Sequence, residues 1–118
     1  DNIPIIRITE MYLIRAEANL RNGTAIGADP LDDINLLRNR AGLSDLTTIT
    51  TDDILIERRK ELALEGHRRM DLLRYKKSLR RPGMDNEEKS VFGADQTVFP
   101  IPQRDRDQNP ELSQNPGY

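Results

Sequence analysis

The sequence predicts an all-α fold that passes into irregular loops and a proline-rich extended segment at its C-terminal end. Apolar residues recur at helical spacing early in the chain, capping residues and glycines bound each such stretch, and the periodicity is lost after residue 77. We therefore predict three parts: a helical part over residues 1–77, a variable loop over 78–97 and an extended segment over 98–118.

The first predicted helix runs from Arg7 to Asn22 and is rich in good helix formers. Gly23 follows it and accepts the left-handed conformation common at helix ends. An apolar stripe recurs every four positions and consists of Ile8, Tyr12, Ala16 and Leu20, widened by Met11, Leu13, Ile14 and Ala18. Apolar groups on more than one side predict a helix that packs against two or more neighbours.

The second predicted helix carries the clearest boundary signals in the chain. Asp29 is expected to cap its N-terminus, Pro30 to occupy the first helical position, and Gly42 to end it. Its buried face is predicted to consist of Leu31, Ile34, Leu37 and Ala41. Because a short loop joins the two helices, we expect them to form an antiparallel hairpin.

A third helix is predicted between Thr51, as its N-cap, and Gly66, as its stop or kink. Its apolar contribution is expected from Ile54, Leu55, Leu62 and Leu64. Beyond Gly66, a shorter helix is expected to turn three apolar residues inward, namely Met70, Leu72 and Leu73.

The remainder of the chain lacks helical periodicity. Residues 78–96 contain proline, glycine and a charged middle, so they are predicted to form an exposed, mobile loop. In "TVFPIP" two prolines remove backbone donors, which predicts an edge strand or an extended segment with Phe99 and Ile101 on one side. The tail after it has two Asn-Pro steps and a Pro-Gly step, which predict turns that must dock to be ordered.

Composition excludes several classes of function. The net charge of the 118 residues is only -2, so no global field draws this surface to DNA or an anionic membrane. The absence of cysteine excludes disulfides, thiolate zinc sites and cysteine nucleophiles. The chain opens on Asp1 and enters the apolar run "IPII" at once, so we expect it to be a fragment of a larger protein with upstream sequence missing.

Glutamates and arginines alternate from residue 57 to residue 77. Three glutamates four residues apart repel one another on one helical face unless cations lie between them, and arginine supplies planar forks that suit carboxylates. We therefore predict a partly buried structural network of Arg38, Arg40, Glu57, Arg58, Glu61, Glu65, Arg68, Asp71 and Arg74. The alternative is a solvated face of weak, exposed ion pairs.

The spacing of these charged residues does not match that of a metal, catalytic or nucleic-acid-binding site. A metal site would use Glu61, Glu65 and His67, but helical carboxylate–histidine sites need a spacing of three, not two. No acid is singled out as one of a catalytic pair, and the basic run over residues 67–81 lacks a nucleic-acid-reading motif. We expect no catalytic residue, no metal, no cofactor and no nucleic acid partner.

Aromatic side chains stack on sugar rings in many carbohydrate sites, but they are scarce in this chain, which has no tryptophan. Tyr75, Phe92 and Tyr118 are the candidate stacking residues for a ligand, with packing or loop anchoring as the alternative role of each.

Five motifs stand in a definite order: "EMYLIRAEANLRNG", "INLLRNRAGL", "ERRKELALEGHRRMDLLRY", "FPIP" and "QNPGY". From about Ile5 to Tyr118, this order resembles the C-terminal part of the SusD/RagB family of outer-membrane nutrient-binding lipoproteins. The resemblance implies tetratricopeptide-like helical hairpins that support irregular ligand-binding loops. It also makes the charged residues above, together with Arg15 and Glu17, look like the family's scaffold signature.

The resemblance further implies a lipid-anchored protein of the Gram-negative cell surface, with the anchor outside this chain. Such proteins bind oligosaccharide or another nutrient and pass it to a SusC-like TonB-dependent transporter, without catalysis. Their ligand-binding aromatics come mainly from regions upstream of the matched part, so no sugar site is transferred to this chain. Two rival functions remain: a stand-alone helical-repeat module that binds a protein in its groove, and an enzyme that uses the acidic face.

Overall fold

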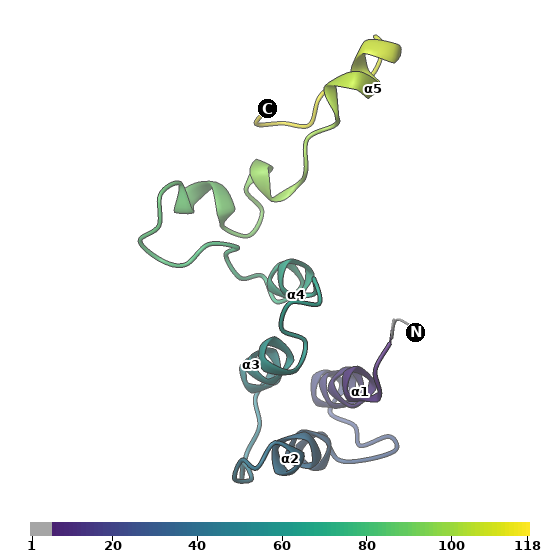
Figure 1. The fold of residues 1–118 in the computed structure, drawn as a ribbon, viewed down its shortest axis with the longest axis vertical. Helices are drawn as coiled ribbons and strands as arrows, with labels where there is room; N and C mark the ends of the chain where they lie inside the picture. Colours follow the sequence, from purple (N-terminus) through teal and green to yellow (C-terminus); the bar gives the residue numbers. More distant parts are fainter. Residues whose placement is uncertain (1–5) are drawn as a thin grey trace. The chain divides into compact units, whose positions relative to one another are not determined.

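The computed structural model describes residues 6–118, and in this part the chain is all-α, as predicted. Its helices are α1 (Ile8–Asn22), α2 (Pro30–Arg40), α3 (Thr51–Glu61), α4 (Arg68–Arg74) and α5 (Gln103–Gln108), with 3-10 helices η1 (Glu87–Ser90) and η2 (Asp95–Thr97) (Figure 1). None of these helices combines the length and apolar character that crossing a membrane requires. Most of the apolar run "IPII" lies outside the described residues.

The chain divides into two compact units, one ending at Arg68 and one running from Arg69 to Tyr118. The first unit holds α1, α2 and α3, and the second holds nearly all of α4 together with α5 and both 3-10 helices. The division into three parts at residues 77 and 97 stays a prediction.

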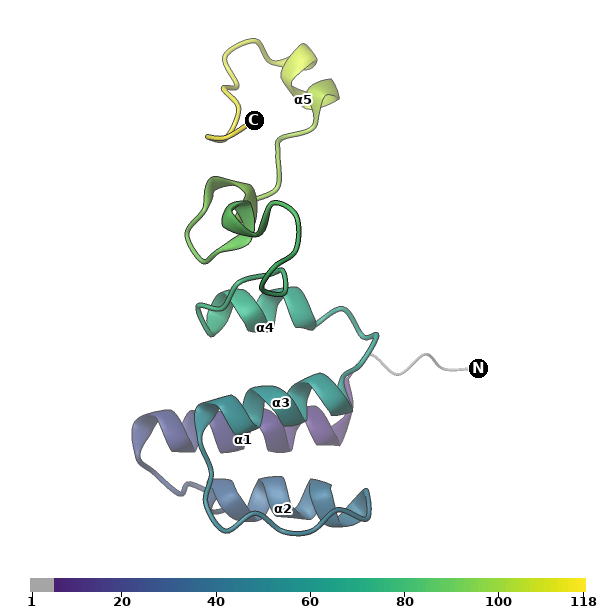
Figure 2. The same cartoon turned by 90° about the vertical axis from the view of Figure 1, so that its left-hand side faces the viewer.

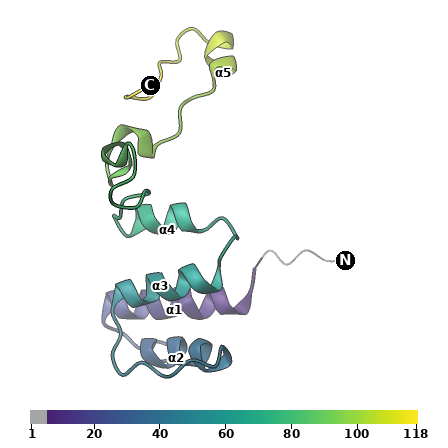
Figure 3. The same ribbon diagram turned by 60° about the vertical axis from the view of Figure 1, so that its left-hand side comes forward.

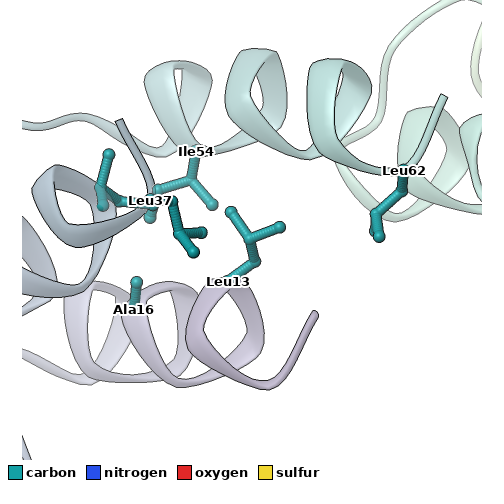
Figure 4. Close-up of a cluster of buried hydrophobic side chains, with 6 residues drawn as sticks. Leu13, Ala16, Leu37, Ile54 and Leu62 are labelled. Carbon is teal, nitrogen blue, oxygen red and sulfur yellow. The ribbon is translucent and has the colours of Figure 1, made fainter. Parts of the chain in front are cut away.

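In the first unit, α1 and α2 form the predicted antiparallel hairpin, and α3 lies beside both (Figure 2). Their facing sides meet in one apolar core, drawn in Figure 4. The buried members of this core are Leu13, Ala16, Ile34, Leu37, Ile54 and Leu62. Burial of these side chains is the main favourable term that holds the three helices together.

Residues 41–50 run back along α2 before α3 begins, as Figure 3 shows. We name this connecting segment the crossover (residues 41–50). The Asn35 side chain fixes it to α2, because the Asn35 amide N–H donates to the Leu46 carbonyl at 3.0 Å and the Asn35 amide oxygen accepts from the Leu46 N–H at 2.8 Å. Leu46 and Ile49 also pack against the core. As a result, α3 runs parallel to α2 and antiparallel to α1, unlike an array in which short turns join each helix to the next.

The loop between α1 and α2 is held by one buried side chain, that of Asn19. Its Oδ1 accepts from the Thr24 hydroxyl at 2.8 Å and from the Ile26 N–H at 3.0 Å. Its Nδ2 donates to the carbonyls of Ile26 and Ala28, each at 3.0 Å. The amide therefore replaces the regular hydrogen bonds that this short loop lacks.

Helix boundaries follow local signals closely. Asp29 caps α2 and accepts from the Leu31 N–H at 2.8 Å, as predicted. The predicted N-cap of α3 is wrong by one residue: Thr50 is the cap, and it forms a capping box with Asp53. The Thr50 hydroxyl accepts from the Asp53 N–H while the Asp53 carboxylate accepts from Thr50, and this reciprocal pair requires the spacing of three that Thr51 does not have with an acid.

The buried face of α1 differs from the predicted stripe. Ile8 is 67% exposed, whereas Thr9 and Leu13 are buried. A step of four residues advances about 40° beyond a full helical turn, so a stripe built only of such steps winds around the helix. The observed inner face alternates steps of four and three, from Thr9 through Leu13 and Ala16 to the partly buried Leu20.

The outer face of α1 is also apolar, and its members Ile8, Met11 and Ile14 are exposed within residues 6–118. The helix thus has apolar groups on two sides, as predicted. Only one of them packs against α2 and α3.

Three further burial predictions are wrong. Ala41 is the exposed C-cap of α2. Because α3 already ends at Glu61, Leu64 falls in the turn that follows, where its φ is 67° and its side chain is exposed. Met70 is exposed while Leu72 is buried, since residues two apart on a helix point to different sides.

In the second unit, Val98 has an extended backbone and residues 98–102 form no strand with other described residues, which agrees with one of the two predicted forms. The helix α5 was not predicted, because the tail was expected to contain turns only. Asp105 lies in its first turn, where an acidic residue favours the start of a helix.

Candidate functional site

The predicted charge network is formed in part, within the first unit. Arg38 Nη1 lies 2.7 Å from Glu57 Oε1, and both side chains are largely buried between α2 and α3. Arg38 Nε also donates to the Ser44 carbonyl at 2.9 Å, and Lys60 Nζ lies 2.9 Å from the same Glu57 oxygen. Arg38 therefore ties α2 to both α3 and the crossover.

A second pair joins the same two helices two residues further along α2 and four residues further along α3. Arg40 Nη2 donates to both carboxylate oxygens of Glu61, at 3.0 and 2.8 Å. Glu61 is mostly buried, whereas more than half of the Arg40 side chain is exposed. Two successive pairs in the same order are possible because α2 and α3 run parallel.

Glu65 does not share the helical face of the other two glutamates, because α3 ends before it. It pairs instead with Arg7 at 2.6 Å, and Arg7 Nη2 also donates to the Glu61 carbonyl. This contact joins the start of α1 to the end of α3. Sequence reasoning missed Arg7 because it stands 58 residues before Glu65.

The pair of Arg15 and Asp33 was also missed. Arg15 donates through Nε and Nη2 to the two Asp33 oxygens, at 2.8 and 2.6 Å, and Asp33 is almost fully buried. The hydrogen bonds that Arg15 donates to Asp33 raise the pKa of Arg15, against a smaller opposing effect of desolvation. The guanidinium also lies 5.4 Å from the centre of the Tyr12 ring.

The other predicted members lie elsewhere. Arg58 is buried within α3. In α4, Asp71 is buried and lies 3.0 Å from Arg74, and Arg68 is the exposed first residue of the helix. That the whole set acts as one structural network stays a prediction.

Within the described residues 6–118, these acidic residues do not form a group typical of a metal site or a catalytic pair. His67 Nδ1 lies 3.8 Å from Glu10 Oε1, and no three described histidine, aspartate or glutamate side chains come close enough together to hold a metal ion. Hydrogen bonds from Thr50 lower the pKa of Asp53, which suits a helix cap rather than a proton donor.

The candidate stacking residues lie in the second unit. Tyr75 has the Arg74 guanidinium 5.0 Å from its ring centre. Phe92 is 50% exposed, with Lys76 Nζ 5.9 Å from its ring centre, and Tyr118 is 52% exposed. Their role in ligand binding stays a prediction.

The motifs "FPIP" and "QNPGY" meet through side chains, in an arrangement that we name the C-terminal clasp (residues 98–101 with Gln114, Asn115 and Tyr118). The Gln114 amide accepts from the Ile101 N–H at 2.8 Å and donates to the Ile101 carbonyl at 3.0 Å. Asn115 Nδ2 donates to the Phe99 carbonyl and the Tyr118 hydroxyl to the Val98 carbonyl, at 2.8 and 2.7 Å. Side chains thus take the place of a neighbouring strand.

Beside the clasp lies a hollow of about 400 Å³. Its lining residues are Glu88, Lys89, Gly93, Ala94, Asp95, Gln96 and Gly117. The backbone at Gly117 lies close to Asp95: a Cβ atom added at Gly117 would lie 2.7 Å from the Asp95 Cβ. Gly117 also has a φ of +87°. Only glycine fits at this position without movement of the neighbouring chain.

Comparison with known proteins gives a consistent result. The model of the SusD family matches residues 1–118. The starch-binding protein SusD of Bacteroides thetaiotaomicron is 35% identical over 99% of this chain, and a SusD-like protein of Formosa agariphila is 32% identical over 99%. The match covers 22% and 25% of those relatives, so the chain spans about a quarter of their length.

Solved structures agree with these sequence matches. The surface glycan-binding protein A of Bacteroides uniformis superposes with a TM-score of 0.78 at 33% identity, over 94% of this chain and 27% of that protein. A SusD-like protein of Bacteroides fragilis gives a TM-score of 0.69 at 27% identity, over 97% of this chain and 25% of that protein.

Proposed function

This chain belongs to the SusD family of non-catalytic binding proteins, and from that premise we propose that its protein binds oligosaccharide or a related nutrient at the cell surface. The nutrient then passes to a SusC-like TonB-dependent transporter for import. The observation that carries this proposal is the match over 99% of the chain to a relative named as starch-binding. A structural relative named as a surface glycan-binding protein supports the same location and ligand class.

The part that this chain plays in the proposed function is mainly that of a scaffold. Its helices are cross-braced by ion pairs between α1, α2 and α3, and its buried polar groups serve loops and caps. A rigid frame of this kind holds binding loops in a fixed geometry, which reduces the entropy lost when a ligand binds. In the proposed protein, a lipid anchor holds this frame at the outer membrane.

The test is uptake by whole cells. We expect deletion of the gene to abolish surface binding and import of one class of fluorescently labelled oligosaccharide, from a panel of α- and β-glucans, xylans and mannans. Restoring the gene should restore both. Unchanged binding and import of every member of the panel would contradict the proposal.

The exposed apolar face of α1 favours the rival function, a helical module that binds a protein partner. The two functions differ in one measurement. If the protein is a protein-binding module, the full-length protein should bind no glycan in calorimetric titration. The proposed function predicts saturable binding of at least one glycan.

A further inference from the structure

We propose that the hollow beside the C-terminal clasp is a saccharide subsite, with Tyr118 as its stacking residue. This inference rests on the proposed function and adds a place of contact within this chain. It concerns only residues of the second unit.

The floor of the hollow has little side-chain bulk. Gly93, Ala94 and Gly117 line it, and a Cβ atom at Gly93 would meet nothing within 4 Å. Its volume of about 400 Å³ falls within the usual range of ligand sites, roughly 300–1,000 Å³. One face of a sugar ring can therefore approach the backbone directly.

The rim supplies groups that pair with hydroxyls. Glu88 and Asp95 offer carboxylate acceptors, whereas Lys89 and Gln96 offer donors, and all four residues are exposed. A sugar hydroxyl donates and accepts at once, so a rim with both kinds of group suits it. The mixed charges disfavour a strongly anionic ligand, because two carboxylates oppose it.

Tyr118 is not among the residues that line the hollow, but it follows one of them in the chain. Its backbone neighbour Gly117 lines the hollow, and its hydroxyl donates to the Val98 carbonyl at 2.7 Å. The ring is thus fixed at both ends while about half of the residue stays exposed. A ring fixed in this way loses little conformational entropy when a sugar stacks on it.

Phe92 precedes the lining residue Gly93 in the chain and is 50% exposed. The turn between η1 and η2 is closed by a hydrogen bond from the Ala94 N–H to the Val91 carbonyl, and η2 begins with one from the Thr97 N–H to the Ala94 carbonyl. The hollow is therefore formed before any ligand arrives.

The test uses the full-length protein, with maltoheptaose, xylohexaose, laminarihexaose, cellohexaose and mannohexaose as probes. With a probe that binds at saturation, we expect hydrogen exchange of the amides in residues 88–96 to slow. Tyr118→Ala should remove this slowing and weaken the affinity about tenfold, and Gln96→Ala should weaken it roughly threefold. Tyr118→Phe is the matched control, because it removes the hydrogen bond to the Val98 carbonyl but keeps the ring, so the affinity should stay close to that of the wild type.

Three results would overturn the subsite. If a probe binds but exchange and affinity are unchanged in both variants, the subsite is wrong and the proposed function stands. If Tyr118→Phe weakens binding as much as Tyr118→Ala, the effect comes from loosening the clasp. If no probe binds the wild-type protein, the proposed function fails together with the subsite. Should Tyr118→Ala fail to fold, Gln96→Ala decides, because its side chain is exposed.

Discussion

Arg38 and Glu57 meet at 2.7 Å across the contact between α2 and α3, and both side chains are largely shielded from water. Removing one member of such a pair leaves the other charge buried without its partner, which is far more costly than losing an exposed ion pair. The stability of the first unit should therefore depend unequally on its ion pairs.

Glu57→Ala should lower the free energy of unfolding by about 3 kcal/mol, because it strands the buried Arg38. Glu61→Ala should cost only about 1 kcal/mol, because Arg40 is half exposed and water can replace the carboxylate. Urea denaturation followed by circular dichroism measures both. Glu111→Ala is the control, because Glu111 is exposed. Equal losses of stability in all three variants would show that burial of an ion pair does not determine its contribution to stability.

Asn19→Ala should destabilise the protein by roughly 2–3 kcal/mol, because several buried hydrogen bonds to the loop are lost at once. Asn22→Ala is the matched control on the same helix, where the side chain is exposed and the change should stay within about 0.5 kcal/mol. Thermal melting of both variants checks this. A similar melting temperature for the two would refute the role assigned to Asn19.

Gly117→Ala should open the C-terminal clasp. The new Cβ would meet Asp95 at 2.7 Å and would also sit on a backbone of positive φ. Gly83→Ala separates the two effects, because Gly83 also has positive φ but open space around it. Hydrogen exchange at the Ile101 N–H should accelerate in the Gly117 variant alone, and equal acceleration in both would assign the effect to backbone strain.

The capping box of α3 makes stability depend on acidity. The Thr50 hydrogen bonds lower the pKa of Asp53 in the folded chain, so its contribution is present above the unfolded pKa of about 3.9. That contribution is lost as the pH falls through the lower, folded pKa. Wild type should therefore lose more stability than Asp53→Asn between pH 5 and pH 2, as measured by urea titrations. Parallel losses would exclude this dependence.

The 118-residue chain on its own should self-associate, because the outer face of α1 exposes Ile8, Met11 and Ile14. Replacing Met11 and Ile14 together by glutamate should shift sedimentation toward the monomer. Ile26→Glu is the control, since Ile26 is exposed in the loop after α1. A monomeric wild-type chain at micromolar concentration would contradict the prediction.

Local signals could be predicted from the sequence, whereas contacts between distant residues could not. Asp29 and Pro30 mark the start of α2 by short-range hydrogen bonding and fixed backbone geometry, and both are visible within a few residues. The buried face of α1 was harder, because both of its sides are apolar and only packing against α2 and α3 selects Leu13 over Ile8.

The candidate site shows the same limit. Two ion pairs, Arg15 with Asp33 and Arg7 with Glu65, join residues that are far apart in the sequence. They follow no local periodicity, because they depend on how the helices are arranged in space. The motifs "FPIP" and "QNPGY" were both visible in the sequence. Their contact through Gln114 was not, because a side-chain amide that pairs with Ile101 leaves no strand-like pattern.

The crossover over residues 41–50 needs a minimum number of residues to connect α2 to α3, but not a fixed number. The helix that it runs beside has 11 residues and so is about 16 Å long, whereas an extended segment covers roughly 3.3 Å per residue. About five residues are the minimum for the return path, so the observed connection contains slack. Insertions there should be tolerated at little entropic cost, whereas deletions below this minimum would force α3 to reverse direction and uncouple every pairing between α2 and α3.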